Sequence, residues 1–312
     1  MSAKRVFVSY CSKQGEWVWD RLVPCLKAGG AEVLIDRERF KAGKSVIGQM
    51  DATQDKANRH VLVLSPDYLK SPHCTHEMNR AIAFDPQFQK HIVLPTLRET
   101  CTLPPKIAKP NPLYVDLRDD KAAPQWTKLM DACSADLGTD TPAWLNARDE
   151  VRRLLRRKES VNLVVSRKVN WRGLVDNVHS EDDPKGAVGP LATVDMQAGA
   201  CASRRGLVEQ IIRVLGGTTP VPQEPEDLVT LNAFISGLPK KPCLALLHFD
   251  YVSHRADYDV NLWGALRDLV TEKKKLYLLI QSLASVQTLL PKDHPMSSGF
   301  TSLQTVELKG RS

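Results

Sequence analysis

The chain has 312 residues, of which 42% are hydrophobic and 25% charged, and its formal net charge at pH 7 is +7. This length suggests about two domains, and the composition agrees with a soluble intracellular protein. No apolar stretch approaches the ~20 residues that cross a bilayer, and no signal-peptide pattern precedes the first strand, so we expect a cytoplasmic protein without a membrane partner.

The first elements in chain order are a strand and a helix. Residues 5–10, Arg-Val-Phe-Val-Ser-Tyr, predict a buried strand. Apolar residues at helical spacing follow until Gly29 and Gly30, which stop the helix. Pro24 lies inside this stretch and predicts a kink or a split helix, because proline in a helix interior removes a hydrogen bond.

A second strand pattern covers residues 32–36 and leads into the polar loop 37–45. The apolar run 61–64 predicts a third strand, which ends at a turn. Strand and helix patterns therefore alternate up to residue 64, and this alternation predicts an α/β fold with a parallel sheet wrapped by helices.

A short helix is predicted after that turn. Ser71 suits the N-cap, and Pro72 suits the first helical position, where its missing N–H costs nothing. Glu77 then falls in the second turn of the helix.

The face of this helix that carries Glu77 is small and weakly polar. Cys74, Glu77 and Ala81 stand at offsets of three and four, beside the apolar Met78 and Ile82. Two interpretations of Glu77 stay open from this pattern alone. One is a partly desolvated functional acid, and the other is an ordinary surface glutamate on an amphipathic helix.

Four blocks in order carry a family resemblance: residues 6–10, 35–44, 63–66 and 71–77. With them, residues 5 to about 135 resemble a TIR domain, specifically the NAD-consuming TIR domains of bacteria and of the animal axon-degeneration enzyme. The resemblance implies a flavodoxin-like parallel sheet and identifies the blocks as the first strand, the second strand with the BB loop, the third strand and the catalytic helix.

The resemblance also implies site residues. In that family the glutamate three residues after the cysteine is catalytic, and Glu77 matches it. Ser9 and Tyr10 end the first strand, where open parallel sheets place their ligand crevice. Two positions depart from the family pattern: the usual tryptophan before the cysteine is His73, and an arginine found after the Ser-Tyr pair in some members is Cys11.

The other candidate substrate-binding residues are Arg39, His73 and Cys74. Arg39 matches a basic residue of the BB loop, which would either meet the NAD phosphates or remain a solvated loop arginine. His73 would either stack on nicotinamide or adenine or remain in contact with water. The BB-loop residues that the resemblance assigns to assembly are Phe40, Gly43 and Lys44.

A lone carboxylate is chemically sufficient for this reaction. Ordinary glycosidases use two acids, because the leaving oxygen must be protonated. Nicotinamide already leaves NAD⁺ as a neutral molecule, so no general acid is required. NAD⁺ is then a substrate and no cofactor is expected; the product is ADP-ribose or a cyclic isomer. In family members the BB loop of a neighbouring TIR domain completes the site, which implies self-association.

Neither a metal site nor a disulfide is expected. The cysteines are odd in number, scattered and without a CxxC pair, so reduced thiols are the default. Histidines flank Cys74, but His73 is adjacent on the helix and faces elsewhere, which argues against a catalytic cysteine. The cysteines are Cys11, Cys25, Cys74, Cys101, Cys133, Cys201 and Cys243.

We place the TIR domain at residues 1–138, with a strand at 113–117 and a closing helix at 126–137. A basic connector helix is expected at 139–159. It would either bind nucleic acid or an acidic partner, or be a solvated connector, which the absence of an aromatic residue from its charged part, 147–159, favours. Its basic residues are Arg148, Arg152, Arg153, Arg156, Arg157 and Lys158.

Residues 160–312 again alternate strand and helix patterns, which predicts a second α/β domain. The predicted strands are 161–165, 191–195, 243–250, 276–281 and 302–308. The predicted helices are 171–179, 204–215, 227–236 and 260–272.

This second domain resembles a degenerate, inactive ATPase of the STAND type. Residues 244–250 resemble a Mg-binding strand, and 276–281 a sensor strand. The phosphate loop is expected at 196–203, which has no Gly-Lys-Ser/Thr. Asp250 would be either a magnesium ligand or an acid that simply ends a strand.

The resulting hypothesis is an NAD⁺ hydrolase activated by TIR self-assembly, an effector of bacterial antiviral defence whose second domain contacts a sensor partner. The alternative is a non-catalytic TIR adaptor that acts through TIR–TIR contacts. A true nucleotide hydrolase in the second domain is disfavoured, because the phosphate loop is missing.

Overall fold

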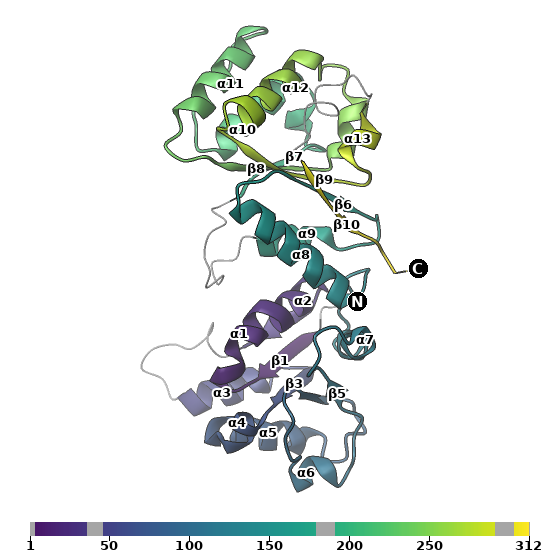
Figure 1. Cartoon of the computed structure of the whole chain (residues 1–312). Helices are drawn as coiled ribbons and strands as arrows, with labels where there is room; N and C mark the ends of the chain where they lie inside the picture. The colour runs from purple at the N-terminus through teal and green to yellow at the C-terminus, as the bar shows by residue number, and fades with distance from the viewer. Residues whose placement is uncertain (1–3, 36–45, 179–190, 291–302, 312) are drawn as a thin grey trace. The chain divides into compact units, whose positions relative to one another are not determined.

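The computed structural model describes residues 4–35, 46–178, 191–290 and 303–311 (Figure 1). The chain divides into two compact units. The first unit comprises residues 1–145, 170–174 and Arg311, and the second comprises 146–169, 175–310 and Ser312. In the described part of the chain, no helix combines the length and apolar character needed to cross a membrane.

The first unit is built on a parallel sheet with the strand order β2-β1-β3-β4-β5. This is the flavodoxin-like order, so the predicted fold class is confirmed. The strands are β1 (Arg5–Ser9), β2 (Glu32–Leu34), β3 (Arg59–Leu64), β4 (Val93–Leu97) and β5 (Val115–Asp116).

Helices cover both faces of this sheet, with α1, α2 and α7 on one face and α3, α4 and α5 on the other (Figure 1). Against α4 and α5 the sheet contributes Leu62 and Leu64 to a buried apolar cluster that contains Tyr68, Met78 and Ile82. The helices are η1 (Ser12–Gln14), α1 (Gly15–Trp17), η2 (Val18–Leu22), α2 (Val23–Ala28), α3 (Val46–Gln54), α4 (Pro66–Lys70), α5 (Pro72–Phe84), α6 (Pro105–Ala108) and α7 (Ala123–Ala132).

Pro24 splits the first helix as predicted. The π-helical turn η2 ends at Leu22, and Pro24 lies in the first turn of α2, where its missing N–H is tolerated. Different physical constraints require glycine at positions 29 and 30. A Cβ on Gly29 would lie 2.7 Å from the Cβ of Ala135, whereas Gly30 has φ +92° and nothing within 4 Å.

The sequence analysis differs from the structure at two places in the first unit. It identified no strand at 93–97, yet β4, which contains Pro95, lies inside the sheet between β3 and β5. The closing helix was placed at 126–137. It instead spans Ala123–Ala132 and ends at Cys133, since Ser134 adopts a left-handed φ of 53° that stops the helix.

The second unit has its own parallel sheet, with the strand order β10-β6-β9-β8-β7. The strands β6 and β7 have the predicted bounds, whereas β8 ends at Leu247 and not at Asp250. His248 adopts a left-handed φ of 54°, which turns the chain out of the strand. The strands are β6 (Val161–Val165), β7 (Leu191–Asp195), β8 (Cys243–Leu247), β9 (Tyr277–Ser282) and β10 (Gln304–Leu308).

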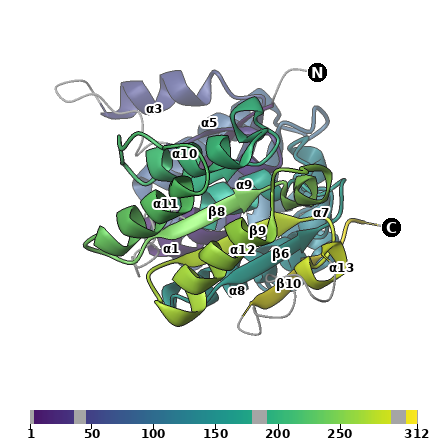
Figure 2. The ribbon, with the colours of Figure 1, turned by 90° about the horizontal axis from the view of Figure 1, so that it is seen from above.

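Helices α10, α11 and α12 lie over one face of this sheet, as the view from above shows (Figure 2). Their apolar residues pack on the strands in one buried cluster, in which Trp263 meets Phe249 edge to face. The helices are η4 (Gly199–Cys201), α10 (Arg204–Val214), α11 (Glu226–Gly237), η5 (Phe249–His254), α12 (Val260–Arg267), η6 (Asp268–Glu272) and α13 (Val286–Leu289).

The predicted connector helix exists as α8 (Thr141–Arg156), but it is not a solvated connector. It buries Trp144 and Val151 completely, and even the side chains of Arg148 and Arg152 are at most 5% exposed. Both α8 and α9 (Trp171–Val178) have residues in each unit. The boundary therefore runs through these helices and not around them.

Candidate active site

The strand order of the first unit creates a switch point between β1 and β3. These strands are neighbours, but the chain continues from β1 to β2 on one side and from β3 to β4 on the other. Loops that diverge in this way open a crevice outside the carboxyl ends of the strands. Ser9 is the last residue of β1, and α4 and α5 follow β3.

Side-chain caps fix the start of both helices. The Ser65 hydroxyl accepts the backbone N–H of Tyr68 (3.1 Å), and the Ser71 hydroxyl accepts that of Cys74 (3.3 Å). A proline occupies the first turn of each helix. Each cap is worth about 1 kcal/mol, and together they hold α4 and α5 against the end of β1. The predicted N-cap at Ser71 is confirmed.

Three polar side chains meet at this edge. The Ser9 hydroxyl is hydrogen-bonded to Glu77 Oε2, and its oxygen lies 2.7 Å from the Tyr68 hydroxyl. Relative exposure is 1% for Ser9, 0% for Tyr68 and 4% for Glu77. Of the two interpretations of Glu77, the structure supports the desolvated acid and excludes the surface glutamate.

The direction of these hydrogen bonds follows from their chemistry when Glu77 is ionised. A carboxylate only accepts, so the Ser9 O–H donates to Glu77. The Ser9 oxygen then accepts from the Tyr68 O–H. Burial raises the pKa of the Tyr68 phenol well above its ordinary value, and the nearby Glu77 raises it further. The phenol therefore keeps its proton at neutral pH, and a chain of two hydroxyls ends on one carboxylate oxygen.

Cys74 and Tyr10 line the same site. The Cys74 thiol contacts the backbone oxygen of Tyr10 (Sγ to O, 3.6 Å), and the Tyr10 hydroxyl accepts from the Trp19 indole at 2.9 Å. Burial raises the pKa of Cys74 to about 11, and the nearby Glu77 adds to this. The thiol is therefore protonated at neutral pH and a poor nucleophile, in agreement with the prediction against a catalytic cysteine.

The helix that carries Glu77 is also fixed from its other side. Gln54, at the end of α3, is fully buried and donates to the backbone oxygen of Glu77 at 2.8 Å. Arg80 of α5 forms two hydrogen bonds with Asp55 Oδ1, at 2.7 and 3.1 Å. These contacts limit how far the Glu77 backbone can shift relative to Ser9.

The remaining candidates lie elsewhere. His73 is exposed on α5, outside the buried cluster that contains Ser9, Cys74 and Glu77. The other candidates lie outside the described residues: Arg39, Phe40, Gly43 and Lys44.

The sequence analysis missed two residues of this site, Tyr68 and Gln54. The Ser65-Pro66 start signal followed by Tyr68 at the end of a buried strand was available as an indication of Tyr68. It did not reveal the contact, because the partner Ser9 is separated from Tyr68 by 59 positions. No sequence signal pointed to Gln54.

The second unit offers a different carboxyl edge. Its switch point lies between β6 and β9, so a phosphate loop would follow β6, at residues 166–170. The expected position, 196–203, was wrong, because that loop follows β7 at the edge of the sheet. Residues 166–170 read Ser-Arg-Lys-Val-Asn, so the Gly-Lys-Ser/Thr pattern is missing there too.

Asp250 has a structural partner. It lies in η5, beyond the end of β8, and both of its carboxylate oxygens accept the backbone N–H of Leu283, at 2.9 and 3.0 Å. Among the residues that the structure describes, no group of histidine, cysteine and acidic side chains is arranged to hold a metal ion.

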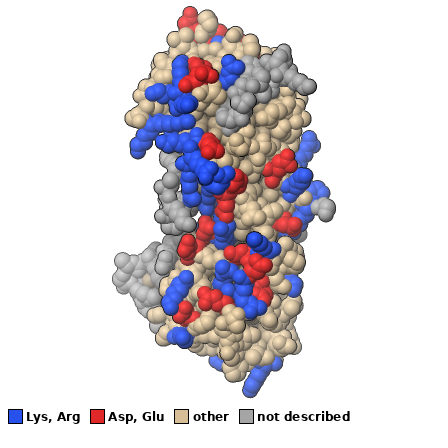
Figure 3. All heavy atoms as spheres, in the orientation of Figure 1, with Lys and Arg blue, Asp and Glu red and all other residues tan. Residues whose placement is uncertain are grey.

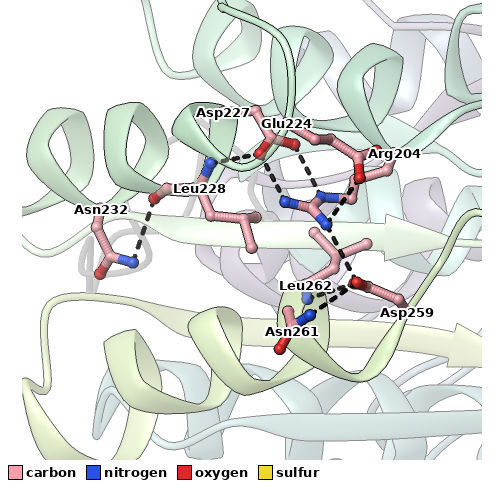
Figure 4. A network of polar contacts seen from close by, with 8 residues as sticks. All are labelled: Arg204, Glu224, Asp227, Leu228, Asn232, Asp259, Asn261 and Leu262. Carbon is pink, nitrogen blue, oxygen red and sulfur yellow. Dashed lines mark hydrogen bonds and ion pairs between the residues drawn. The ribbon is translucent and has the colours of Figure 1, made fainter.

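Arg204 lies at the centre of a buried ion-pair network in this unit (Figure 4). Its guanidinium binds Asp227 through two hydrogen bonds, at 2.6 and 2.8 Å, and reaches Asp259 at 3.1 Å and Glu224 at 3.2 Å. Arg204 is 3% exposed and Asp227 is fully buried. Asp259 also caps α12. The network links α10, the start of α11 and α12.

The TIR domain family matches residues 6–130. Human Toll-like receptor 1 is 29% identical over 72 residues, which make up 23% of this chain and 9% of the receptor, so the match spans only a small part of that relative. The TIR domain of the Toll-related receptor TRR-2 from Hydra magnipapillata is 22% identical, with a TM-score of 0.36 over 41% of this chain and 96% of that chain.

A Walker-type ATPase of Pyrococcus abyssi is 12% identical, with a TM-score of 0.36 over 53% of this chain and 52% of that chain. Likeness at this level assigns no activity to the second unit.

Proposed function

We propose that the TIR domain formed by residues 6–130 is an NAD⁺ hydrolase that releases nicotinamide. The observation that supports this best is the carboxylate of Glu77, which is buried and hydrogen-bonded to Ser9 at the end of β1. This is the edge of the sheet at which open parallel folds bind ligands.

The reaction needs little from the protein. The bond between the anomeric carbon and the pyridinium nitrogen breaks, and its electron pair stays with nicotinamide, which leaves neutral. Positive charge develops on the anomeric carbon, and the Glu77 carboxylate stabilises it. A fixed charge in a water-poor site contributes about 10²–10³ in kcat. Water then adds to this carbon and releases a proton, which gives ADP-ribose; attack from within the molecule gives a cyclic product.

The neighbouring groups have supporting roles. Ser9 holds one carboxylate oxygen, and Tyr68 in turn holds the Ser9 hydroxyl. Pre-oriented groups of this kind need no reorganisation as the charge develops. The Tyr10 backbone and the protonated Cys74 thiol would line the substrate side of the site.

Activity is proposed to depend on self-association of TIR domains, with the second unit contacting a sensor partner. Such an enzyme would act as an effector of bacterial antiviral defence, which depletes NAD⁺ when the chains cluster.

The test uses the full chain with NAD⁺, in dilute buffer and with a crowding agent that promotes assembly. Mass spectrometry follows nicotinamide, ADP-ribose and cyclic ADP-ribose, and light scattering reports assembly. We expect turnover in the assembled sample and a loss of about a hundredfold to a thousandfold in kcat in Glu77→Gln. The matched control is Glu99→Gln, an exposed glutamate that follows β4 at the same edge of the sheet, and it should retain the wild-type rate.

Equal turnover in the wild type and in Glu77→Gln would remove the proposed role of Glu77. Assembly without turnover in both proteins would favour the alternative function, a TIR adaptor that acts only through TIR–TIR contacts.

A further inference from the structure

Lysines line one edge of the sheet in the second unit. Strands β6, β9 and β8 are adjacent and parallel, so their amino ends lie at the same edge. A short loop that carries lysine precedes each of them, and Figure 3 shows lysine and arginine side chains gathered on one side of this unit. We define the basic edge as Arg157, Lys158, Lys240, Lys241, Lys273, Lys274 and Lys275.

The charges of the basic edge are close enough to repel one another. Lys241 Nζ lies 3.5 Å from the backbone oxygen of Lys158 and 5.6 Å from the ring centre of Tyr277. Burial lowers the pKa of Lys241, and the positive charges of Lys158 and Lys274 lower it further. Neighbouring strands are about 4.8 Å apart, which is less than the Debye length of ~8 Å at physiological salt, so solvent ions screen this repulsion incompletely.

Acidic groups compensate only part of this charge: Asp268, Glu159 and Glu272 lie beside the seven basic residues. Lys273 pairs with Asp268 at 2.8 Å. Within the described ranges, Lys158, Lys274 and Lys275 form no ion pair with an acidic side chain. A surface that concentrates charge of one sign raises the local concentration of oppositely charged ligands.

Two of these lysines also occupy unusual backbone positions. Lys158 has φ 58° and Lys274 has φ 52°, just beyond α8 and η6. Glycine or asparagine is the usual residue at such left-handed positions. A lysine near a helix C-terminus is also favoured by the helix dipole. Asparagine adopts this backbone conformation readily but carries no charge. Replacing these lysines with asparagine therefore tests the effect of the charge on binding without straining the backbone.

We propose that the basic edge binds the phosphate backbone of nucleic acid without reading its sequence. Protein–protein interfaces are depleted in lysine and rely on aromatic, methionine and arginine anchors. The basic edge is instead rich in lysine, and Tyr277 beneath Lys241 is only 5% exposed. Lysine ammonium groups are compact point charges suited to phosphates. This inference does not depend on NAD⁺ hydrolysis.

The surface differs from the arginine-rich helix considered in the sequence analysis. Only Arg157 and Lys158 belong to both sets. The other lysines come from loops before β8 and β9, so the surface exists only once the sheet has formed.

The test measures fluorescence anisotropy of labelled 30-mer duplex DNA, single-stranded DNA and duplex RNA with the full chain, from 50 to 200 mM KCl. The variant K158N/K274N should bind at least about fivefold more weakly, and its salt slope on duplex DNA should fall by about 1.8, because each lost phosphate contact contributes about 0.9. Thermal unfolding checks that the variant folds.

The matched control is R167N/K168N, which removes the same charge at exposed residues after β6, on the opposite edge of the same sheet. Its affinity should stay within twofold of the wild type. Unchanged affinity in K158N/K274N, or no binding of the wild type to any nucleic acid, would overturn the proposal. Tighter binding to polyglutamate or to phosphatidylserine vesicles than to nucleic acid would overturn it as well, in favour of an acidic protein or a membrane.

Discussion

The two units use the same architecture differently at the carboxyl edges of their sheets. In the first unit, two hydroxyls lead to the buried carboxylate of Glu77. In the second unit, Asn162, the second residue of the inner strand β6, is fully buried and donates to Ile280 and Ser282 of β9. It accepts from Val286 of α13, so its contacts reach the carboxyl edge through Ser282 and Val286. Asn162 thus ties β6 to β9 and to the first residue of α13.

This difference shows that a parallel sheet with a switch point offers a position for an active site, whereas the side chains at that position decide whether a reaction can occur. The first unit puts a charge at that place. The second unit uses its polar groups there, and in the Arg204 network beyond the sheet, to hold loops and helices together. Four predictions test this contrast, from the largest expected effect to the smallest.

Arg204→Met should destabilise the second unit most. Removing one partner of a buried ion pair leaves the others unpaired and costs about 3–5 kcal/mol. Urea unfolding, followed with probes that distinguish the two units, should show an early transition for the second unit only. The control is Arg205→Met, since the Arg205 side chain is partly exposed and its pair with Glu209 contributes at most about 0.5 kcal/mol. Equal losses in the two variants would contradict the assigned role of Arg204.

His60 should make the first unit sensitive to acid. It is 1% exposed and stacked on Phe84, with ring centres 5.6 Å apart, and burial lowers its pKa to about 4. Because the folded pKa lies below the ordinary value, the stability contribution is complete above pH 6.5 and is lost as pH falls toward 4. The loss amounts to about 3 kcal/mol.

The measurement is the free energy of unfolding of the first unit between pH 4 and 7.5. His60→Phe should flatten most of this dependence, whereas His73→Gln should leave it unchanged, because His73 is exposed. An unchanged slope in His60→Phe would contradict the assignment to His60.

Tyr68→Phe should lower the catalytic rate of the first unit without removing Glu77. It removes the hydroxyl that donates to Ser9, at a cost of about 1 kcal/mol, which corresponds to about a fivefold loss in kcat with little change in KM. Ser9→Ala removes a hydrogen bond to a charged group and should cost more, about 2 kcal/mol. Nicotinamide release measures both. A change in KM alone would show that these hydroxyls bind the substrate and do not position Glu77.

Asp250→Asn should have the smallest effect. The amide oxygen still accepts the Leu283 N–H, so we expect a loss of about 0.5–1 kcal/mol in the second unit. Neither the wild type nor the variant should hydrolyse ATP above background. An ATPase rate that depends on Asp250 would contradict the contrast between the two units, because the second unit would then be catalytic as well.

Local sequence patterns predicted the strands of the second unit, because short apolar runs bounded by polar loops depend on neighbours in the chain. They did not identify β4, a five-residue strand that contains Pro95 and lies inside the sheet. They also misplaced the phosphate loop, because the order of strands depends on pairing between distant segments.

At the site, the resemblance of residues 71–77 to the catalytic helix of TIR domains pointed to Glu77, and the strand-edge rule pointed to Ser9. The role of Tyr68 was not predicted, since its hydrogen bond joins it to Ser9, 59 positions away in the sequence. The position of Glu77 could therefore be predicted from the sequence, whereas the groups that hold its carboxylate could not.

The adjacent glycines at the end of α2 should leave different traces in a saturation mutagenesis of the first unit. At Gly29 every side chain collides with the turn at Ala135, so no substitution should be tolerated. At Gly30 a side chain has room, and the only constraint is the positive φ of the backbone. Asparagine should therefore be tolerated there, whereas β-branched residues should not. Two neighbouring positions with the same residue would thus obey different substitution rules.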